Sequence, residues 1–274
     1  MTAPVPDEIL VGERGGRSLS FDRVAAEYDA TRGGEARGAW HASLLAPHLD
    51  PARPVLEVGV GTGAVALGLV RAGFAVHGVD LSPAMLRSAR ERLGGVVVAA
   101  DATALPLRSA GVAQAVCVWV LHLVGDVAAV IAEVSRVLEP GGRWVVVPGG
   151  GDPPETPDVI TALTVDMERR LHGGAFAGPR PSPRRLEALA AESGLTLEGV
   201  VSPPTIAYAE SPEEAATKLE RRTFSACWDL DDATYAEVVA PVVAALRALP
   251  YPDQPIQRES ARQVVVVLRK GASG

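Results

Sequence analysis

The fold of this chain is decided at residues 55–67, which read VLEVGVGTGAVAL. Residues 55–58 follow a proline and are mostly apolar, which predicts a short buried strand. Gly59, Gly61 and Gly63 permit a tight turn in which backbone N–H groups approach a ligand closely. Small and apolar residues from Ala64 onward favour a helix, whose N-terminus carries a partial positive charge. The stretch therefore predicts a strand, a ligand-binding turn and a helix of an α/β sheet.

The turn alone leaves more than one ligand open. Its spacing, Gly59-x-Gly61-x-x-Ala64, also matches the dinucleotide fingerprint, which by itself is weak evidence. Glu57 stands two residues before the first glycine. A carboxylate there would repel a pyrophosphate but suits a cationic ligand. A turn that binds no ligand is the third alternative.

Acidic residues stand at the ends of three successive predicted strands: Glu57, Asp80 after residues 74–79, and Asp101 after residues 96–100. Asp80 lies about 20 residues beyond the turn, where an acid binds ribose hydroxyls in doubly wound folds. Asp101 can accept a hydrogen bond from an adenine amino group, with the Ala102 N–H nearby. Because these strand ends border one crevice, the three acids together with the turn are more specific evidence for a ligand-binding site than the glycines alone.

Together these residues resemble class I S-adenosylmethionine-dependent methyltransferases that act on small molecules. The glycine turn resembles their first motif. Further similarities are the segment FD…A..YD within residues 21–32, LSPAML at 81–86 and L.PGG at 138–142. Ser82 is the expected N-cap of a helix, and the turn at 140–142 precedes a strand predicted over residues 143–147. The resemblance covers about residues 20–150. It implies that the acid and glycine loop hold the amino acid end of S-adenosylmethionine, whose demethylated product is S-adenosylhomocysteine.

The same resemblance implies the fold and the site. The expected fold is α/β, a Rossmann-like, doubly wound sheet of seven strands in the order 3-2-1-4-5-7-6, with strand 7 antiparallel and helical cap elements. The expected cofactor-binding residues are Tyr28, Glu57, Gly59, Val60, Gly61, Asp80, Leu81, Met85, Asp101, Ala102 and Val118. Met85 either lies against the adenine or belongs to the core. Residues 21–32 form either a lid over the cofactor, with Tyr28 facing the site, or a helix packed on the sheet edge.

Methyl transfer from a sulfonium is an in-line displacement, for which the protein supplies alignment and desolvation. His122, at the end of a strand predicted over residues 114–122, is the candidate general base because its pKa suits that work. Many methyltransferases of this type have a histidine here without using it so. Tyr28 is a second candidate, for orienting substrate or cofactor. No metal site is predicted.

The second half of the chain shows fewer motifs. We expect a flexible N-terminus over residues 1–20, a cofactor-binding core over 21–150, and the rest of the sheet over 151–274 with cap insertions at about 151–180 and 203–255. Strands are predicted at 195–201 and 262–269, and helices at 156–171, 182–194 and throughout 212–249. Candidates for the substrate pocket are Phe176, Tyr208, Arg222, Phe224 and Trp228. Arg222 could meet an acidic substrate or lie on a surface helix face.

Composition limits the partners. Of the 274 residues, 47% are hydrophobic and the net charge is −7, which argues against sequence-independent binding of nucleic acid. No leader or membrane-spanning run is apparent, so we expect a cytoplasmic monomer or homodimer without membrane partners. The predicted activity is methyl transfer to a small organic molecule, for example a bacterial secondary metabolite. Alternatives are a tRNA or protein methyltransferase, an NAD-dependent oxidoreductase and a non-catalytic cofactor-binding regulatory protein.

Overall fold

The computed structural model describes residues 32–94, 96–149, 155–171, 182–224 and 230–272, together with Phe21, Ala25, Tyr28, Asp29 and Cys227. Its centre is a seven-stranded sheet in the order β3-β2-β1-β4-β5-β9-β6. The strands are β1 (Val55–Val58), β2 (Val76–Asp80), β3 (Val97–Ala99), β4 (Val112–Val118), β5 (Leu138–Val147), β6 (Leu195–Val201) and β9 (Val265–Lys270). All neighbours pair in parallel except β9, which runs antiparallel to both β5 and β6. The predicted strand order is therefore confirmed, with β9 as the seventh strand.

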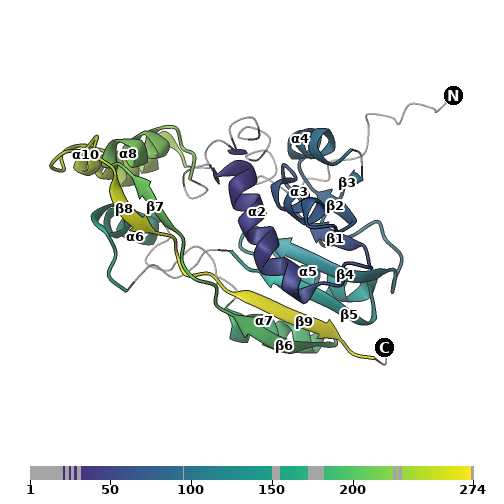
Figure 1. Cartoon of the computed structure of the whole chain (residues 1–274). Helices are drawn as coiled ribbons and strands as arrows, with labels where there is room; N and C mark the ends of the chain where they lie inside the picture. The colour runs from purple at the N-terminus through teal and green to yellow at the C-terminus, as the bar shows by residue number, and fades with distance from the viewer. Residues whose placement is uncertain are drawn as a thin grey trace.

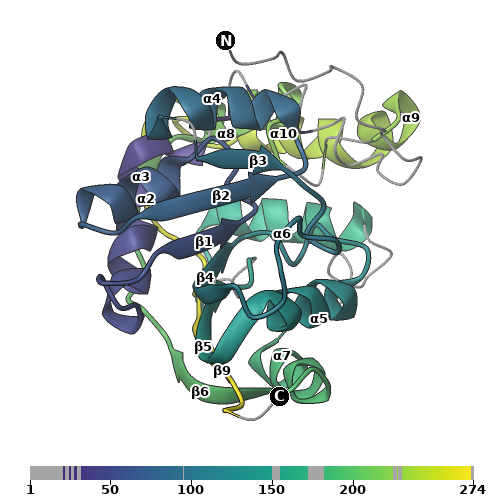
Figure 2. The ribbon, with the colours of Figure 1, turned by 90° about the vertical axis from the view of Figure 1, so that its right-hand side faces the viewer.

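Helices cover both faces of this sheet (Figures 1 and 2). One face carries α5 (Val127–Val137) and α7 (Pro183–Glu192), and the other carries α2 (Gly34–Leu45), α3 (Ala64–Arg71) and α4 (Pro83–Leu93). Each face has its own apolar core, the first under α5 and α7 and the second under α2, α3 and α4. In β1, Leu56 and Val58 belong to the first core and Val55 to the second, as the alternation of side chains along a strand requires. Figure 2 shows the seven strands one below another between these two layers. Both cores thus meet at β1, directly before the glycine turn.

Two strand boundaries differ from the prediction. The fourth strand was expected to reach His122 but ends at Val118, because Trp119 takes a left-handed conformation with φ 59°. The fifth strand was expected to begin at Arg143 but begins at Leu138. Its predicted Pro-Gly-Gly turn is an irregularity within the strand, since Val112 pairs with Leu138 and Gln114 already pairs with Arg143.

A second structural unit, the cap, lies between β6 and β9 in the sequence and also includes α6. Its elements are α6 (Val159–Leu171), β7 (Ala207–Glu210), α8 (Pro212–Glu220), α9 (Asp232–Thr234), a π-helical segment (Tyr235–Val239), α10 (Ala240–Arg247) and β8 (Ile256–Glu259). Ile160 and Met167 of α6 pack with Leu219 of α8 and Leu246 of α10 in a third apolar core. Pro241 cannot donate a backbone hydrogen bond, and the π segment ends two residues before it, at Val239.

The antiparallel pair β7–β8 was not predicted. Figure 1 shows it continuing the line of β6 and β9 toward the cap. At the neck between the two sheets, the N–H of Ser260 donates to the carbonyl of Ile206 at 2.8 Å, and Ser260 Oγ accepts from the N–H of Ile206 at 2.9 Å. The two strands of the cap, β7 and β8, are therefore connected to the main sheet through β6 and β9.

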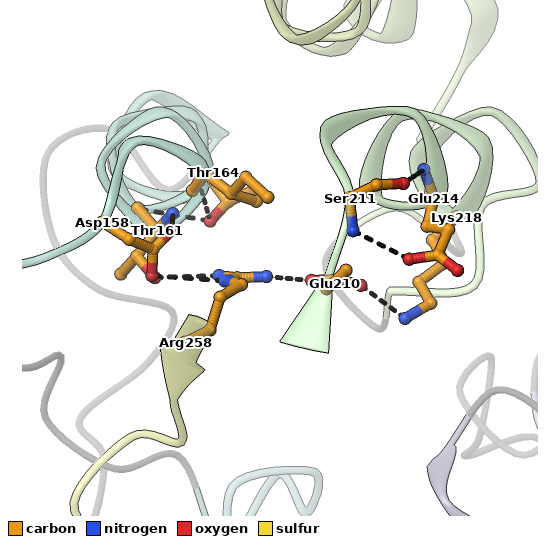
Figure 3. A network of polar contacts seen from close by, with 9 residues as sticks. Asp158, Thr161, Thr164, Glu210, Ser211, Glu214, Lys218 and Arg258 are labelled. Carbon is orange, nitrogen blue, oxygen red and sulfur yellow. Dashed lines mark hydrogen bonds and ion pairs between the residues drawn. The ribbon is translucent and has the colours of Figure 1, made fainter. Parts of the chain in front are cut away.

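Buried charges hold the cap elements together (Figure 3). The guanidinium of Arg258 on β8 contacts Asp158 before α6 at 3.2 Å, donates to Thr161 Oγ1 at 2.8 Å, and pairs with Glu210 on β7. Glu210 also pairs with Lys218 on α8 at 2.5 Å. The side chains of Arg258 and Glu210 are 9% and 7% exposed.

Among the described residues, no helix combines the length and the apolar character that a membrane span needs.

Candidate active site

The glycine turn adopts a backbone that suits glycine. Gly59, Gly61 and Gly63 have φ angles of 78°, 55° and 83°. The N–H groups of Gly59 and Val60 both donate to the carbonyl of Val79 on β2, which fixes the turn to the sheet. A Cβ at Gly59 would lie 2.1 Å from Val120 Cγ2, whereas a Cβ at Gly61 would meet nothing within 4 Å. Gly59 is thus required by packing, and Gly61 faces open space.

Asp80 lies at the centre of the hydrogen bonds beneath that space. Its Oδ2 accepts from the N–H of Gly61 at 2.8 Å, and its Oδ1 accepts from the N–H of Ser82 at 2.9 Å. Ser82 in turn caps α4 by accepting from the N–H of Met85, as predicted. The carboxylate therefore joins the turn after β1 to the loop after β2 and lines the cavity above them.

Asp101 is arranged differently. Its Oδ1 accepts from both the N–H and the hydroxyl of Thr103, each at 2.8 Å. The residue is exposed, and it borders the same cavity as Asp80. Parallel strands carry both acids to one edge of the sheet, which is the arrangement that the sequence predicted for these two residues.

Glu57 does not line that cavity. Its side chain is 2% exposed and lies under α3, where it accepts from the N–H of Ala66. Burial, with the nearby Asp80 charge, raises the pKa of Glu57 well above its ordinary value. The structure thus places this acid beneath the glycine turn, at the N-terminal turn of a helix, rather than at the mouth of the pocket.

One cavity lies along the carboxyl ends of β1, β2, β3 and β4. Of the residues predicted to bind cofactor, the cavity is lined by Tyr28, Gly59, Gly61, Asp80, Leu81, Met85, Asp101, Ala102 and Val118. Val60 packs against Gly78 instead, and Met85 is 1% exposed, so it belongs to the core as well. Further lining residues, outside the predicted cofactor-binding set, are Val79, Ser82, Ala100, Trp119, Val120, Leu123 and Val124. Most are apolar and give no motif by which sequence reasoning could find them.

The segment before α2 contributes to the cavity wall. Phe21 and Tyr28 both line it, with ring centroids 6.3 Å apart, and both have helical backbone. Asp29 accepts from the Thr62 hydroxyl in the glycine turn at 2.7 Å and pairs with Arg92 on α4. Arg92 also donates to the carbonyl of Thr62 at 2.8 Å. This three-residue latch, which sequence reasoning missed, ties the segment carrying Tyr28 to the turn.

Trp119 also lines the cavity, and its backbone conformation is unusual. A φ of 59° is uncommon for a bulky residue and is held by its surroundings. The indole Nε1–H donates to Gln263 Oε1 at 3.3 Å, and the guanidinium of Arg37 lies over the indole ring at 3.5 Å. The His41 ring packs edge-on against the same indole.

The remaining predicted residues lie elsewhere. His122 is half-buried beside Gly149, where a Cβ would lie 2.3 Å from its Nδ1, and it is not among the lining residues. Arg222 donates to the Leu230 carbonyl and to Asp232, and Phe224 packs on the third core. Phe176 and Trp228 lie outside the described residues, as do residues 1–20. Of the described substrate candidates, Tyr208 on β7 is 38% exposed, and the charge of Arg37 on α2 acts on its hydroxyl.

The sheet order, the glycine turn and the acid-bordered cavity together define the class I S-adenosylmethionine-dependent methyltransferase fold. Residues 56–146 match the family model described as a methyltransferase domain. This stretch is therefore similar to the methyltransferase domains of that family.

Similar proteins point the same way. A ubiquinone/menaquinone biosynthesis C-methyltransferase of Desulfotalea psychrophila is 33% identical over 51% of this chain and 60% of its own length. A demethylmenaquinone methyltransferase of Streptomyces griseus is 32% identical over 46% of this chain and 57% of its own length. The chain thus spans little more than half of these relatives.

Solved structures share the fold over most of the chain. A SAM-dependent methyltransferase from Thermotoga maritima has a TM-score of 0.53 at 20% identity, covering 92% of this chain and 98% of that one. The [4+2]-cyclase SpnF has a TM-score of 0.58 at 19% identity, covering 93% and 96%. At such identities the likeness establishes the fold, and a protein named for another reaction shares it.

Proposed function

We propose that this protein is an enzyme that binds S-adenosylmethionine in the cavity beside the glycine turn and transfers its methyl group to a small organic acceptor. The observation that carries the proposal is Asp80, which lines the cavity and joins the turn after β1 to the loop after β2. The family match over residues 56–146 supports it.

The residues present fit this cofactor. Gly61 faces open space, so the backbone there can approach a ligand that a side chain would keep away. Asp80 would hold the ribose hydroxyls, since each carboxylate oxygen accepts more than one hydrogen bond. Asp101 would accept from the adenine amino group through Oδ2, because Thr103 already uses Oδ1. The apolar lining, which includes Leu81, suits an adenine ring.

When bound, the cofactor supplies a methyl group already activated on a sulfonium. The chain would contribute alignment and exclusion of water. Tyr28, which lines the cavity and is fixed by the Asp29 latch, would cover the reacting centre. His122 is proposed as a general base only for acceptors that must lose a proton. Its ring lies against Gly149 and does not line the cavity.

The acceptor is proposed to be a small metabolite rather than RNA or protein. A cap of α6, α8, α10 and the β7–β8 pair is attached to the sheet, and the net charge of −7 disfavours nucleic acid. One relative is named a ubiquinone/menaquinone biosynthesis C-methyltransferase and another a demethylmenaquinone methyltransferase. Aromatic or enolic carbon acids are therefore one group of acceptors to include in a screen.

Two measurements test the proposal. Calorimetric titration with S-adenosylmethionine and, separately, with NAD should show binding of the former alone. Incubation with labelled cofactor and a panel of metabolites, tRNA and proteins, read by mass spectrometry, should place the methyl group on a small molecule. Cofactor binding with no methyl transfer to any class would instead support a regulatory role, or a cyclisation such as the one for which the [4+2]-cyclase SpnF is named.

A further inference from the structure

Two arginines lie where the start of α2 meets the cap. Arg37 is on α2, which Figure 1 places on the side of the sheet toward the cap. Arg32 precedes α2 and donates to the carbonyl of Thr223, which follows α8 in the cap, at 2.9 Å. Arg37 donates to the carbonyl of Arg32 at 3.1 Å, so the two guanidiniums belong to one cluster.

Both arginines are half-buried. Burial lowers the pKa of Arg37 to about 10, and the neighbouring Arg32 charge adds to the effect. Arginine stays protonated at neutral pH under such a shift, so the positive charge is held at a cost. Glu168 on α6 attracts Arg32, whereas no carboxylate among the described residues pairs with Arg37. The excess positive charge is therefore concentrated at Arg37.

Arg37 is positioned rather than loose. Its guanidinium stacks at 3.5 Å on the ring of Trp119, a residue that lines the cofactor cavity. The ring is held from its other sides by Gln263 and His41. Burial and the Arg37 charge lower the pKa of His41 to about 4, so this imidazole is neutral at physiological pH. The charge at this wall thus comes from the arginine alone.

The cap contributes a phenol on which the charge of Arg37 acts. Tyr208 on β7 is 38% exposed and lies under Arg258, whose guanidinium is 5.4 Å from the ring centre. Burial raises the pKa of its hydroxyl, and the charges of Arg258 and Arg37 act against that rise. Arg37 and Tyr28 also interact through their charges. Arg37 therefore stacks on a residue of the cofactor cavity, and its charge acts on the hydroxyls of Tyr28 and of Tyr208 in the cap.

We infer that Arg37 is the specificity residue of the acceptor site, and that the acceptor carries an anionic oxygen, a carboxylate or an ionised enol or phenol, which pairs with its guanidinium. A guanidinium with unused donors recognises such an oxygen through charge-assisted hydrogen bonds. The anion would also offset the repulsion between Arg32 and Arg37. This inference rests on the proposed methyltransferase function and names its substrate class.

The test uses the full chain saturated with S-adenosylhomocysteine, whose binding is measured first. The probes are three carboxylates with their neutral amides: benzoate and benzamide, 4-hydroxycinnamate and its amide, octanoate and octanamide. A parallel series replaces the carboxylates by phenols of low pKa with their methyl ethers, which separates the two sources of anionic oxygen. We expect at least one anion to bind about tenfold or more tightly than its neutral partner.

Arg37→Gln should abolish that preference in protein that still binds S-adenosylhomocysteine, whereas Arg37→Lys should keep part of it. Arg169→Gln, on the exposed face of α6, is the matched control and should change nothing. The inference is overturned if no anion binds more tightly than its neutral partner, or if folded Arg37→Gln keeps the preference. Loss of S-adenosylhomocysteine binding in the wild-type protein would instead contradict the proposed function.

Discussion

The cofactor half and the cap of this molecule are built on different principles. Around the glycine turn, the chain is fixed by backbone groups that bond to neighbouring strands and to Asp80. In the cap, side-chain charges join segments that lie up to 100 residues apart, as Arg258 does with Asp158. The function of the first half can therefore be predicted from a local sequence motif, whereas the contacts that hold the cap together become apparent only in the folded structure.

The largest expected effect breaks the cap and spares the turn. Arg258→Met leaves Glu210 and Asp158 buried without their shared partner, which should destabilise the cap by about 3–5 kcal/mol. Unfolding in urea, followed by the fluorescence of a probe in the cap, should lose its cooperative transition or shift it strongly. Affinity for S-adenosylmethionine should change little. Arg169→Gln, which removes an exposed pair, is the control and should leave the transition in place.

The complementary change attacks the turn. Gly59→Ala puts a Cβ 2.1 Å from Val120 on a residue with φ 78°. We expect a cost of about 1–3 kcal/mol from the clash and strain, together with loss of measurable cofactor binding. Gly73→Ala separates strain from site, because its φ is also positive, at 95°, but nothing lies within 4 Å. Normal cofactor affinity in a folded Gly59→Ala protein would contradict the account of the turn.

A smaller effect is expected at the latch of Asp29, Thr62 and Arg92, which joins the Tyr28 segment to the glycine turn. Asp29→Asn keeps the size of the side chain but removes its charge pair with Arg92. The Tyr28 segment should then be held less firmly, and cofactor affinity should fall by about fivefold, the equivalent of one hydrogen bond. Glu35→Gln, which breaks an exposed pair with Arg71, should leave affinity unchanged. Equal affinities in the two variants would remove the latch from the site.

The smallest effect concerns pH. Burial acts to raise the pKa of Asp158, but its hydrogen bonds with Thr161 and the Arg258 charge outweigh burial and lower it. A lowered folded-state pKa stabilises the protein above the unfolded value, and that stability is lost as pH falls through the folded value. Cap stability should therefore decline below about pH 4, and Asp158→Asn should decline less steeply. Parallel pH curves for the two proteins would argue against this group.

Sequence reasoning reached the parts of the molecule in which local chemistry dictates structure. The strand and turn at residues 55–63, the Ser82 cap of α4 and the order of the sheet were predictable from motifs and the family pattern. Trp119 was not, because nothing in an apolar run signals a left-handed residue. The β7–β8 pair escaped because each strand has four residues and mixed burial. Glu57 was placed at the cavity because strand position gives the end of a strand but not the burial of its side chain.

The most direct test of the central claim is calorimetric titration of wild-type protein and Asp80→Ala with S-adenosylmethionine and NAD. The account predicts that the wild type binds S-adenosylmethionine and not NAD. It also predicts that the folded variant loses about 1.5–3 kcal/mol of binding free energy for each charge-assisted bond to the ribose. A wild-type protein that binds NAD instead, or a folded Asp80→Ala variant with unchanged affinity for S-adenosylmethionine, would contradict it.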